Sequence, residues 1–435
     1  MAAAPPHVAY VAERFYDDEA PPPSTVGFTA WLRENLFSSP LNSALTVISV
    51  TLLALYLPGL FQWAVTHSVW NASSLRECRA IMDASFGEGV RGACWAVINE
   101  RFMQLIYGFY PSALRWRPNI AFVLLLIAMI PVLFETMRSL LWIAGGGLAI
   151  KAATTVVSLA QGDGFGPLQS PTTYFMVGAL VLAYFFGGRE HRRKWLILSA
   201  LFPVIAYFLL WGGAFGLDRV PSSRFGGFLL TMIIGVTGIA ASLPIGIALA
   251  LGRRSDMVFI RSISVMFIEF IRGVPLITLL FVASTLLNYF LPPGTEFDLI
   301  LRVLIMVTLF ASAYMAEVVR GGLAALPKGQ YEAADAMGLT YWQSMRLIIL
   351  PQALKISIPG IVNTFIGLFK DTTLVAVIGL LDPLGLTNPI RADSNWNGIV
   401  WELYGFIGFV FFLFCWGMSQ YSMFLERKLR AGDRR

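Results

Sequence analysis

The sequence has few of the residues that chemistry at a metal or a thiol requires. Its 435 residues include only three cysteines and three histidines. Neither set has metal-ligand spacing, and no CxxC redox pair occurs. Charged residues make up only 13% of the chain. We therefore expect no metal site, no bound cofactor and no catalytic residues in this chain.

A phosphate-binding loop is also missing. The dipeptide Gly-Lys occurs nowhere in the sequence, which excludes a GxxxxGK[ST] motif. The glycines between Gly235 and Gly246 have the small-xxx-small spacing that usually indicates close helix packing. The chain is therefore not expected to hydrolyse ATP by itself.

Apolar residues dominate instead. They make up 57% of the chain, and the mean hydropathy is +0.68, well outside the range of soluble domains. Several apolar runs reach the roughly 20 residues that a helix needs to cross a bilayer. They are continuous and do not alternate as barrel strands do. The sequence predicts an all-α polytopic membrane protein.

The first half is irregular. Residues 1–43 are predicted to be a cytoplasmic tail, rich in proline, that ends in an interfacial helix at Thr29–Phe37. Residues 44–225 are predicted to be a membrane extension, with a polar, periplasmic segment at 66–118. Its apolar runs lie at about 44–64, 120–143, 146–159, 174–187 and 196–215. The third run is weak, because Lys151 and three glycines interrupt it.

The second half is more regular. After a soft boundary at Gly216–Arg224, residues 226–430 carry five strong runs, at about 226–252, 263–291, 299–321, 358–381 and 404–424. The basic stretches at Arg253–Arg254, Arg189–Lys194 and Glu426–Arg435 are placed in the cytoplasm by the positive-inside rule. The net charge of +6 is therefore attributed to the orientation of the chain in the membrane. No nucleic-acid partner is expected. If the N-terminus is cytoplasmic as well as the C-terminus, the number of spans must be even. This favours about ten spans.

The cytoplasmic loop at 327–355 carries the most informative pattern, PKGQYEAADAMGLTYWQSMRLIILPQALK. Pro327 is expected to end one helix, Gly338 to make a turn, and Pro351 to begin the return into the bilayer. The small residues Ala333, Ala334 and Ala336 permit another backbone to approach closely. A docking helix is therefore favoured over a free loop.

Seven residues of this loop match the EAA signature of ABC importer permeases at that family's spacing. They are Glu332, Ala333, Ala334, Gly338, Ile348, Leu350 and Pro351. A plain amphipathic linker would match only one or two of these positions by chance. The resemblance implies a coupling helix that docks on a separate ATPase dimer, which would hold ATP and Mg.

Three further stretches resemble the polar amino-acid branch, which contains the histidine, glutamine and arginine importers. They are FIEFIRGVPLITLLF, SAYMAEVVRGGLAALPKGQYEAA and LFKDTTLVAVIGLLD. This similarity covers about Gly226–Arg430. The long first half, with the stretch at Leu75–Phe102, resembles the larger permease of general L-amino-acid and glutamate/glutamine/aspartate/asparagine importers of Gram-negative bacteria.

The resemblance implies a five-helix type I permease core in a multi-pass inner-membrane subunit that is not an enzyme. Its cargo would be acidic amino acids and their amides, or L-amino acids broadly. Its partners would be the ATPase dimer, a periplasmic amino-acid-binding protein and a second, shorter permease. Alternating access would carry the cargo. Two alternatives stay open, an ion-coupled secondary transporter and a non-transporting receptor, although the unequal halves disfavour the first.

Ionisable residues within spans are costly, so they indicate either function or a buried pair. The candidates for the substrate pathway are Glu269, Arg272, Glu317, Arg320, Lys370, Asp371, Thr372 and Thr373. Arg320 could hold the substrate carboxylate and Glu317 the amino group. The alternative is a structural ion pair of Glu317 with Arg320 or Arg272. For Glu269 the structural interpretation is favoured.

Cys78 and Cys94 are predicted to form a disulfide if residues 66–118 face the oxidising periplasm. Two free thiols are the alternative, because spacing alone fixes no geometry. Cys415 lies in the last run and is expected to stay reduced.

Overall fold

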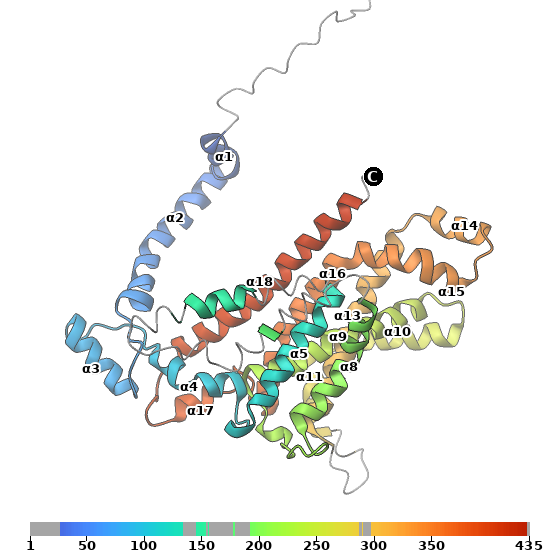
Figure 1. Cartoon of the computed structure of the whole chain (residues 1–435). Coiled ribbons are helices and arrows are strands. Elements are labelled where there is room, and N and C mark those ends of the chain that lie inside the picture. Colours follow the sequence, from blue (N-terminus) through green and yellow to red (C-terminus); the bar gives the residue numbers. More distant parts are fainter. Residues whose placement is uncertain are drawn as a thin grey trace, which may run out of the picture. The chain divides into compact units, whose positions relative to one another are not determined.

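The computed structural model describes residues 27–133, 145–153, 155, 177–178, 192–286, 289 and 297–432. Over these residues the named elements are all helices, and the only β pairing is two isolated bridges. Two compact units are present, Met1–Trp70 with Glu77–Trp95 and Asn71–Arg76 with Ala96–Arg435. The predicted all-α polytopic membrane fold is confirmed (Figure 1).

Six helices in the described ranges are long and apolar enough to cross a membrane. They are Pro40–Thr66, Ser112–Leu133, Gly227–Arg253, Leu299–Ala325, Tyr341–Ile378 and Trp401–Leu429. The predicted run at 174–187 and parts of those at 120–143 and 146–159 fall outside the described residues. The count of about ten spans therefore stays a prediction.

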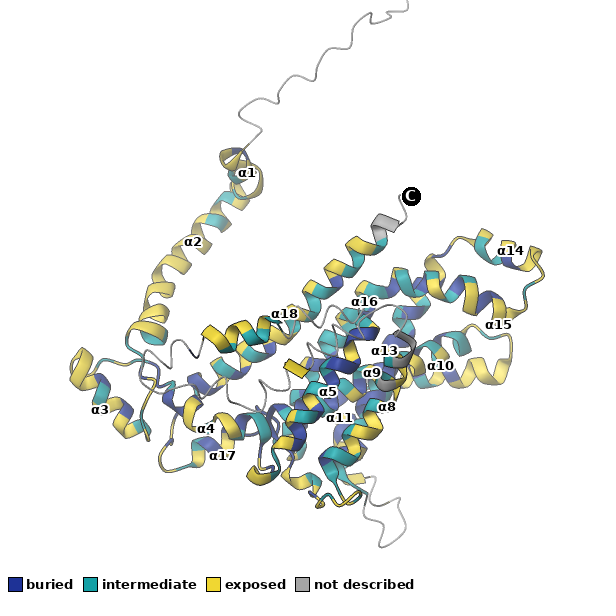
Figure 2. Ribbon diagram, viewed as in Figure 1, coloured by how far each residue is buried: buried dark blue, intermediate teal, exposed yellow. Residues whose placement is uncertain are grey.

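The first unit contains α1 (Phe28–Asn35), α2 (Pro40–Phe61), the π turn η1 (Gln62–Thr66) and most of α3 (Leu75–Phe86). The start of α2 is well defined, because the Ser39 side chain accepts a hydrogen bond from the Asn42 backbone N–H and Pro40 occupies the first turn. No residue of α2 is buried within the chain (Figure 2). Its apolar side chains are therefore available to contact the hydrocarbon of the bilayer or another subunit.

The segment after η1 folds back on the end of this helix. The Val69 N–H donates to Ala93 O over 2.9 Å, and the Ala93 N–H donates to Trp63 O over 2.8 Å. Cys78 and Cys94 are buried and paired as a disulfide, with their Cα atoms 6.1 Å apart. This spacing lies within the range that a disulfide allows. The structure therefore gives the predicted pair a feasible geometry.

We predict that alkylating the denatured, unreduced protein labels only Cys415, and that prior reduction exposes three thiols to the reagent. Intact mass gives the count directly. A Cys78→Ser, Cys94→Ser double variant should lose about 3 kcal/mol of unfolding free energy in the chain-entropy model. Three labelled thiols before reduction would contradict the bond.

The second unit contains the remaining helices. In chain order, over the described ranges, they are α4 (Ala96–Tyr107), η2 (Ser112–Leu114), α5 (Trp116–Leu133), α8 (Arg192–Trp211), η4 (Ser222–Arg224), α9 (Gly227–Arg253), α10 (Val258–Gly273), α11 (Leu276–Phe281), η5 (Val282–Leu286), α13 (Leu299–Ala325), α14 (Lys328–Ala336), α15 (Tyr341–Ser344), η6 (Met345–Ile349), α16 (Leu350–Asp371), η7 (Thr372–Ile378), α17 (Thr387–Ala392) and α18 (Trp401–Gly432). Helix α9 packs against α4, α10, α13 and α16.

Glycines set the distance between α9 and its neighbours. A Cβ atom at Gly246 would lie 2.6 Å from Cβ of Met315, and one at Gly238 would lie 3.2 Å from a methyl carbon of Val307. Gly246 follows Gly238 by as many residues as Met315 follows Val307, and in the same direction. Helices α9 and α13 therefore run parallel. The glycine pattern of α9 therefore serves close helix packing.

The run predicted at 263–291 is not one straight helix. Helix α10 ends at Gly273, and the axis turns by 101° before α11 and η5. Val274 is extended, with φ −111° and ψ 133°. The cause is Pro275, which disfavours helical geometry at the residue before it and lacks a backbone N–H.

Candidate functional site

The loop at 327–355 forms a helical hairpin between α13 and α16. Pro327 precedes α14, and Gly338 makes the turn to α15 with φ +71°. Thr340 caps α15 in a capping box with Gln343. Each break thus has a local cause in a proline, a left-handed glycine or a cap.

The signature residues divide between the two sides of this hairpin. Ala334 is fully buried, and Ile348 packs against a core cluster that includes Met315, Leu323 and Ile349. Glu332, Ala333 and Gly338 are exposed. Large apolar side chains are also exposed beside them, with relative exposures of 71% for Met337, 70% for Trp342 and 65% for Leu347. An exposed apolar surface of this kind marks an interaction site.

A cluster of ion pairs lies at the C-terminal end of α9. Arg253 Nη1 donates to Glu269 Oε1 on α10 and to Glu317 Oε1 on α13, both over 2.8 Å. Glu317 Oε2 also lies 3.6 Å from Arg272 Nη1 and 3.0 Å from Arg320 Nη2. The Glu317 carboxylate thus contacts three arginines from three helices, and these contacts include the pair of Glu317 with Arg320 that the structural alternative names.

Arg253 is the residue that the sequence argument missed as part of this cluster. In the sequence this arginine stands out only as a positive-inside signal. Nothing in a single sequence distinguishes such an arginine from one that binds acids on two other helices. The distinction needs the packing of α9 against α10 and α13.

The candidates on the fourth core helix lie elsewhere. Lys370 is exposed at the end of α16, Asp371 is half-buried, and Thr372 is buried at the start of η7. The Thr372 hydroxyl donates to Phe369 O over 2.7 Å, and the Thr373 hydroxyl donates to Lys370 O over 2.9 Å. Both threonines therefore stabilise the change from α-helix to 3₁₀-helix.

The two sets of candidates lie at different depths. Gly235 of α9 faces Phe369 and Thr372, whereas Gly246 faces Met315, two residues before Glu317. Eleven residues of α-helix correspond to about 16 Å. The structure therefore does not bring Lys370 and Asp371 together with Glu317 and Arg320 in one substrate site.

A second polar turn follows η7, outside the spans. The buried Asp382 carboxylate accepts hydrogen bonds from the Gly385 N–H over 2.8 Å and the Leu384 N–H over 3.3 Å. Burial nevertheless raises the pKa of Asp382 to about 6. The turn leads into α17, and next to it Leu381 O accepts a hydrogen bond from the Gly227 N–H over 2.7 Å. This hydrogen bond holds the first residue of α9 beside the turn.

We predict that Glu317→Gln destabilises the protein more than Glu269→Gln. Both carboxylates bind the same nitrogen of Arg253, but the side chain of Glu317 is 17% exposed and that of Glu269 is 54% exposed. The first change leaves three arginines without their shared partner and should cost about 1–3 kcal/mol. The second should cost below about 1 kcal/mol.

Thermal unfolding of the purified protein, followed by tryptophan fluorescence, measures both changes. Equal losses in the two variants would show that the cluster does not depend on the shared carboxylate.

The sequence is similar to known proteins over most of its length. Residues 242–430 match the model of the family described as "Binding-protein-dependent transport system inner membrane component". The chain is 53% identical to the glutamate/glutamine/aspartate/asparagine transport system permease protein BztC of Rhodobacter capsulatus, over 95% of this chain and 96% of that protein. It is 41% identical to the inner membrane amino-acid ABC transporter permease protein YhdY of Escherichia coli K12, over 92% and 93%.

A solved structure described as an amino acid ABC transporter with histidines is 28% identical. The likeness covers 46% of this chain and 91% of that one, with a TM-score of 0.42.

Proposed function

Since the chain belongs to the inner-membrane permeases of amino-acid ABC transporters, we propose that its cargo is glutamate, glutamine, aspartate and asparagine. One observation carries the proposal, namely that a permease of that description is 53% identical over 95% of this chain. The match includes the N-terminal extension as well as the core. The proposal thus concerns the whole architecture and not only the five-helix core.

We propose that ATP and Mg are held by a separate ATPase dimer, which docks on α14. The exposed Glu332 and Ala333 and the apolar Met337 and Trp342 support this. Movement of the docked helix would then rock the core helices between two arrangements, as alternating access requires. A second permease of the same type, shorter than this one, would form the other half of the path, and a periplasmic binding protein would deliver the cargo.

We propose further that the cargo first meets this chain at Lys370 and Asp371. Lys370 is exposed where α16 changes to η7, and an ammonium group there can attract the carboxylate of an amino acid. Arg272 and Arg320 lie deeper and are 35% and 42% exposed in their side chains. They would form a later, cytoplasmic part of the same path, with Glu317 holding them in place.

The cargo assignment is tested by uptake into membrane vesicles from cells that make the complete transporter. We predict ATP-dependent uptake of labelled glutamate, and competition by unlabelled glutamine, aspartate and asparagine but not by arginine or leucine. Uptake that an ionophore abolishes and that needs no ATP would reject the proposal. Equal competition by all five unlabelled amino acids would show a broad importer instead.

We also predict that Gly338→Leu abolishes uptake while Gly338→Asn retains most of it. A Cβ atom at Gly338 would meet nothing within 4 Å, so the difficulty is not a clash but the left-handed φ of +71°. Asparagine adopts that conformation far more readily than leucine. Both variants should insert into the membrane normally, as fractionation can verify. Equal uptake in both would remove this turn from the coupling mechanism.

A further inference from the structure

Helix α2 and η1 form one span, and its length sets the depth of its last residues. The span Pro40–Thr66 has 27 residues, which correspond to about 40 Å of helix. Hydrocarbon takes up roughly 30 Å of a bilayer, so about three residues at each end of a centred span lie among the headgroups. No residue of this span is buried within the chain (Figure 2). Its end at Trp63–Thr66 therefore lies where hydrocarbon meets the headgroups.

A second segment is tied to this same end of the span. The Ala93 N–H donates to Trp63 O over 2.8 Å. The indole Nε1–H of Trp95 donates to Ala64 O, also over 2.8 Å. Both acceptors belong to η1, which ends the span. Trp95 therefore lies at the depth of the headgroup boundary.

Three tryptophan rings meet at this depth. The ring of Trp95 stacks on that of Trp70, with 5.9 Å between the centroids, and meets the ring of Trp63 edge-on at 6.2 Å. The indole N–H groups of Trp95 and Trp70 already have acceptors in the chain, Ala64 O and Ser68 Oγ. Trp70 is nevertheless 63% exposed. The rings thus present an apolar surface whose polar groups are satisfied.

The disulfide keeps this surface in place. Cys94 directly precedes Trp95, and its bond to Cys78 ties the segment to α3. The backbones on either side are in direct contact, because a Cβ atom at Gly92 would lie 1.8 Å from His67 O. Trp95 therefore cannot leave the cluster unless the whole closed loop moves with it.

We propose that the aromatic surface of Trp63, Trp70 and Trp95 binds the headgroup boundary of the phospholipid bilayer. Tryptophan favours that boundary, because its ring is largely apolar and its one polar group can still be bonded. The span that leads directly to the surface also favours lipid as the occupant. A protein partner touches one side of a helix, whereas the apolar residues of α2 are spread around its whole circumference.

The contact sets the depth of α2 and holds the closed loop against the membrane, whichever cargo the transporter carries. Helix α3 supports this orientation of the loop. Cys78 and Met82, one turn apart, are buried, whereas Arg79, Ala80 and Asp83 are exposed. The loop therefore has a charged side for water in addition to its aromatic side for lipid.

The test places a nitroxide spin label on the full chain at Leu57→Cys, Trp70→Cys or Ala80→Cys, each with Cys415→Ser and an intact disulfide. The complete transporter is reconstituted in phospholipid vesicles with partner subunits that carry no free cysteine. Power saturation then measures how often the label collides with oxygen, which concentrates in hydrocarbon, and with a water-soluble nickel chelate. Leu57, 51% exposed within the span, is the lipid reference, and Ala80 is the water reference.

We expect the ratio of oxygen to nickel collisions at Trp70→Cys to lie well above that at Ala80→Cys and below that at Leu57→Cys. A ratio equal to that at Ala80→Cys would place the surface in water and overturn the proposal. Low rates for both reagents at Trp70→Cys would overturn it as well, because a protein subunit would then cover the surface.

A second measurement keeps all the cysteines and decides if the labelled chains do not assemble. Tryptophan emission of the wild type and of Trp70→Phe is compared in vesicles of ordinary lipid and of lipid brominated near the headgroup end of its chains. Bromine quenches the indole rings that it touches. Trp70→Phe should therefore lower the quenched fraction of the emission, and an unchanged or higher fraction would contradict the lipid contact.

Discussion

The close approach of α9 to its neighbours is the constraint on which the second unit depends. Gly235, Gly238 and Gly246 place α9 against side chains of α16 and α13 with no Cβ atom between. In hydrocarbon, helices gain no hydrophobic energy from association, so contact area and backbone proximity must supply the attraction. A side chain at Gly246 would collide with Met315 and push α9 away from α13, whereas one at Gly235 or Gly238 would require Phe369 or Leu368 to shift.

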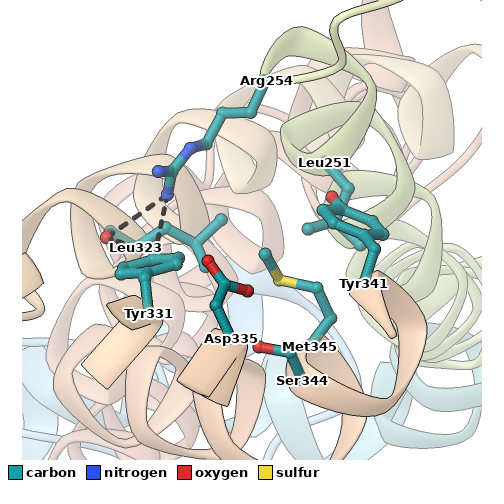
Figure 3. A pocket seen from close by; sticks show the side chains of 8 residues that line it. All are labelled: Leu251, Arg254, Leu323, Tyr331, Asp335, Tyr341, Ser344 and Met345. Carbon is teal, nitrogen blue, oxygen red and sulfur yellow. Dashed lines mark hydrogen bonds between the residues drawn. The ribbon is translucent and has the colours of Figure 1, made fainter. Parts of the chain in front are cut away.

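At the end next to the hairpin, α9 carries two adjacent arginines with different partners. Arg253 turns toward the bundle and binds acids on α10 and α13. Arg254 turns toward the hairpin and binds Tyr331 on α14 (Figure 3). One helix end thus connects the membrane core to the hairpin. A charge pair there keeps its strength better than an exposed surface pair, because neighbouring helices limit the access of water.

The sequence predicted these features unevenly, for physical reasons. A long apolar run identifies a span, and the prediction of 226–252 differs from α9 by one residue at each end. The run at 358–381 differs more, since α16 already begins at Leu350 in polar sequence. Hydropathy reports contact with lipid, and a helix can extend beyond it. Spacing could also suggest the Glu317–Arg320 pair, three residues apart on one helix. It could not suggest Arg253, because that contact spans 64 residues and depends on tertiary packing.

The extension acts on the opposite end of α9. Helix α4 packs on α9, and Gly108 lies so close to Gly226 that no side chain fits between the two backbones. Arg101 of α4 forms an ion pair with Asp393, and the Leu75 N–H donates to Asn395 O over 2.8 Å. These contacts are partly backbone to backbone, whereas Arg253 and Arg254 hold the other end through long side chains. Side chains can exchange partners while a backbone contact cannot. Contacts with α4 therefore hold α9 where it begins, and beyond Gly246 the opposite end is held through side chains that can exchange partners.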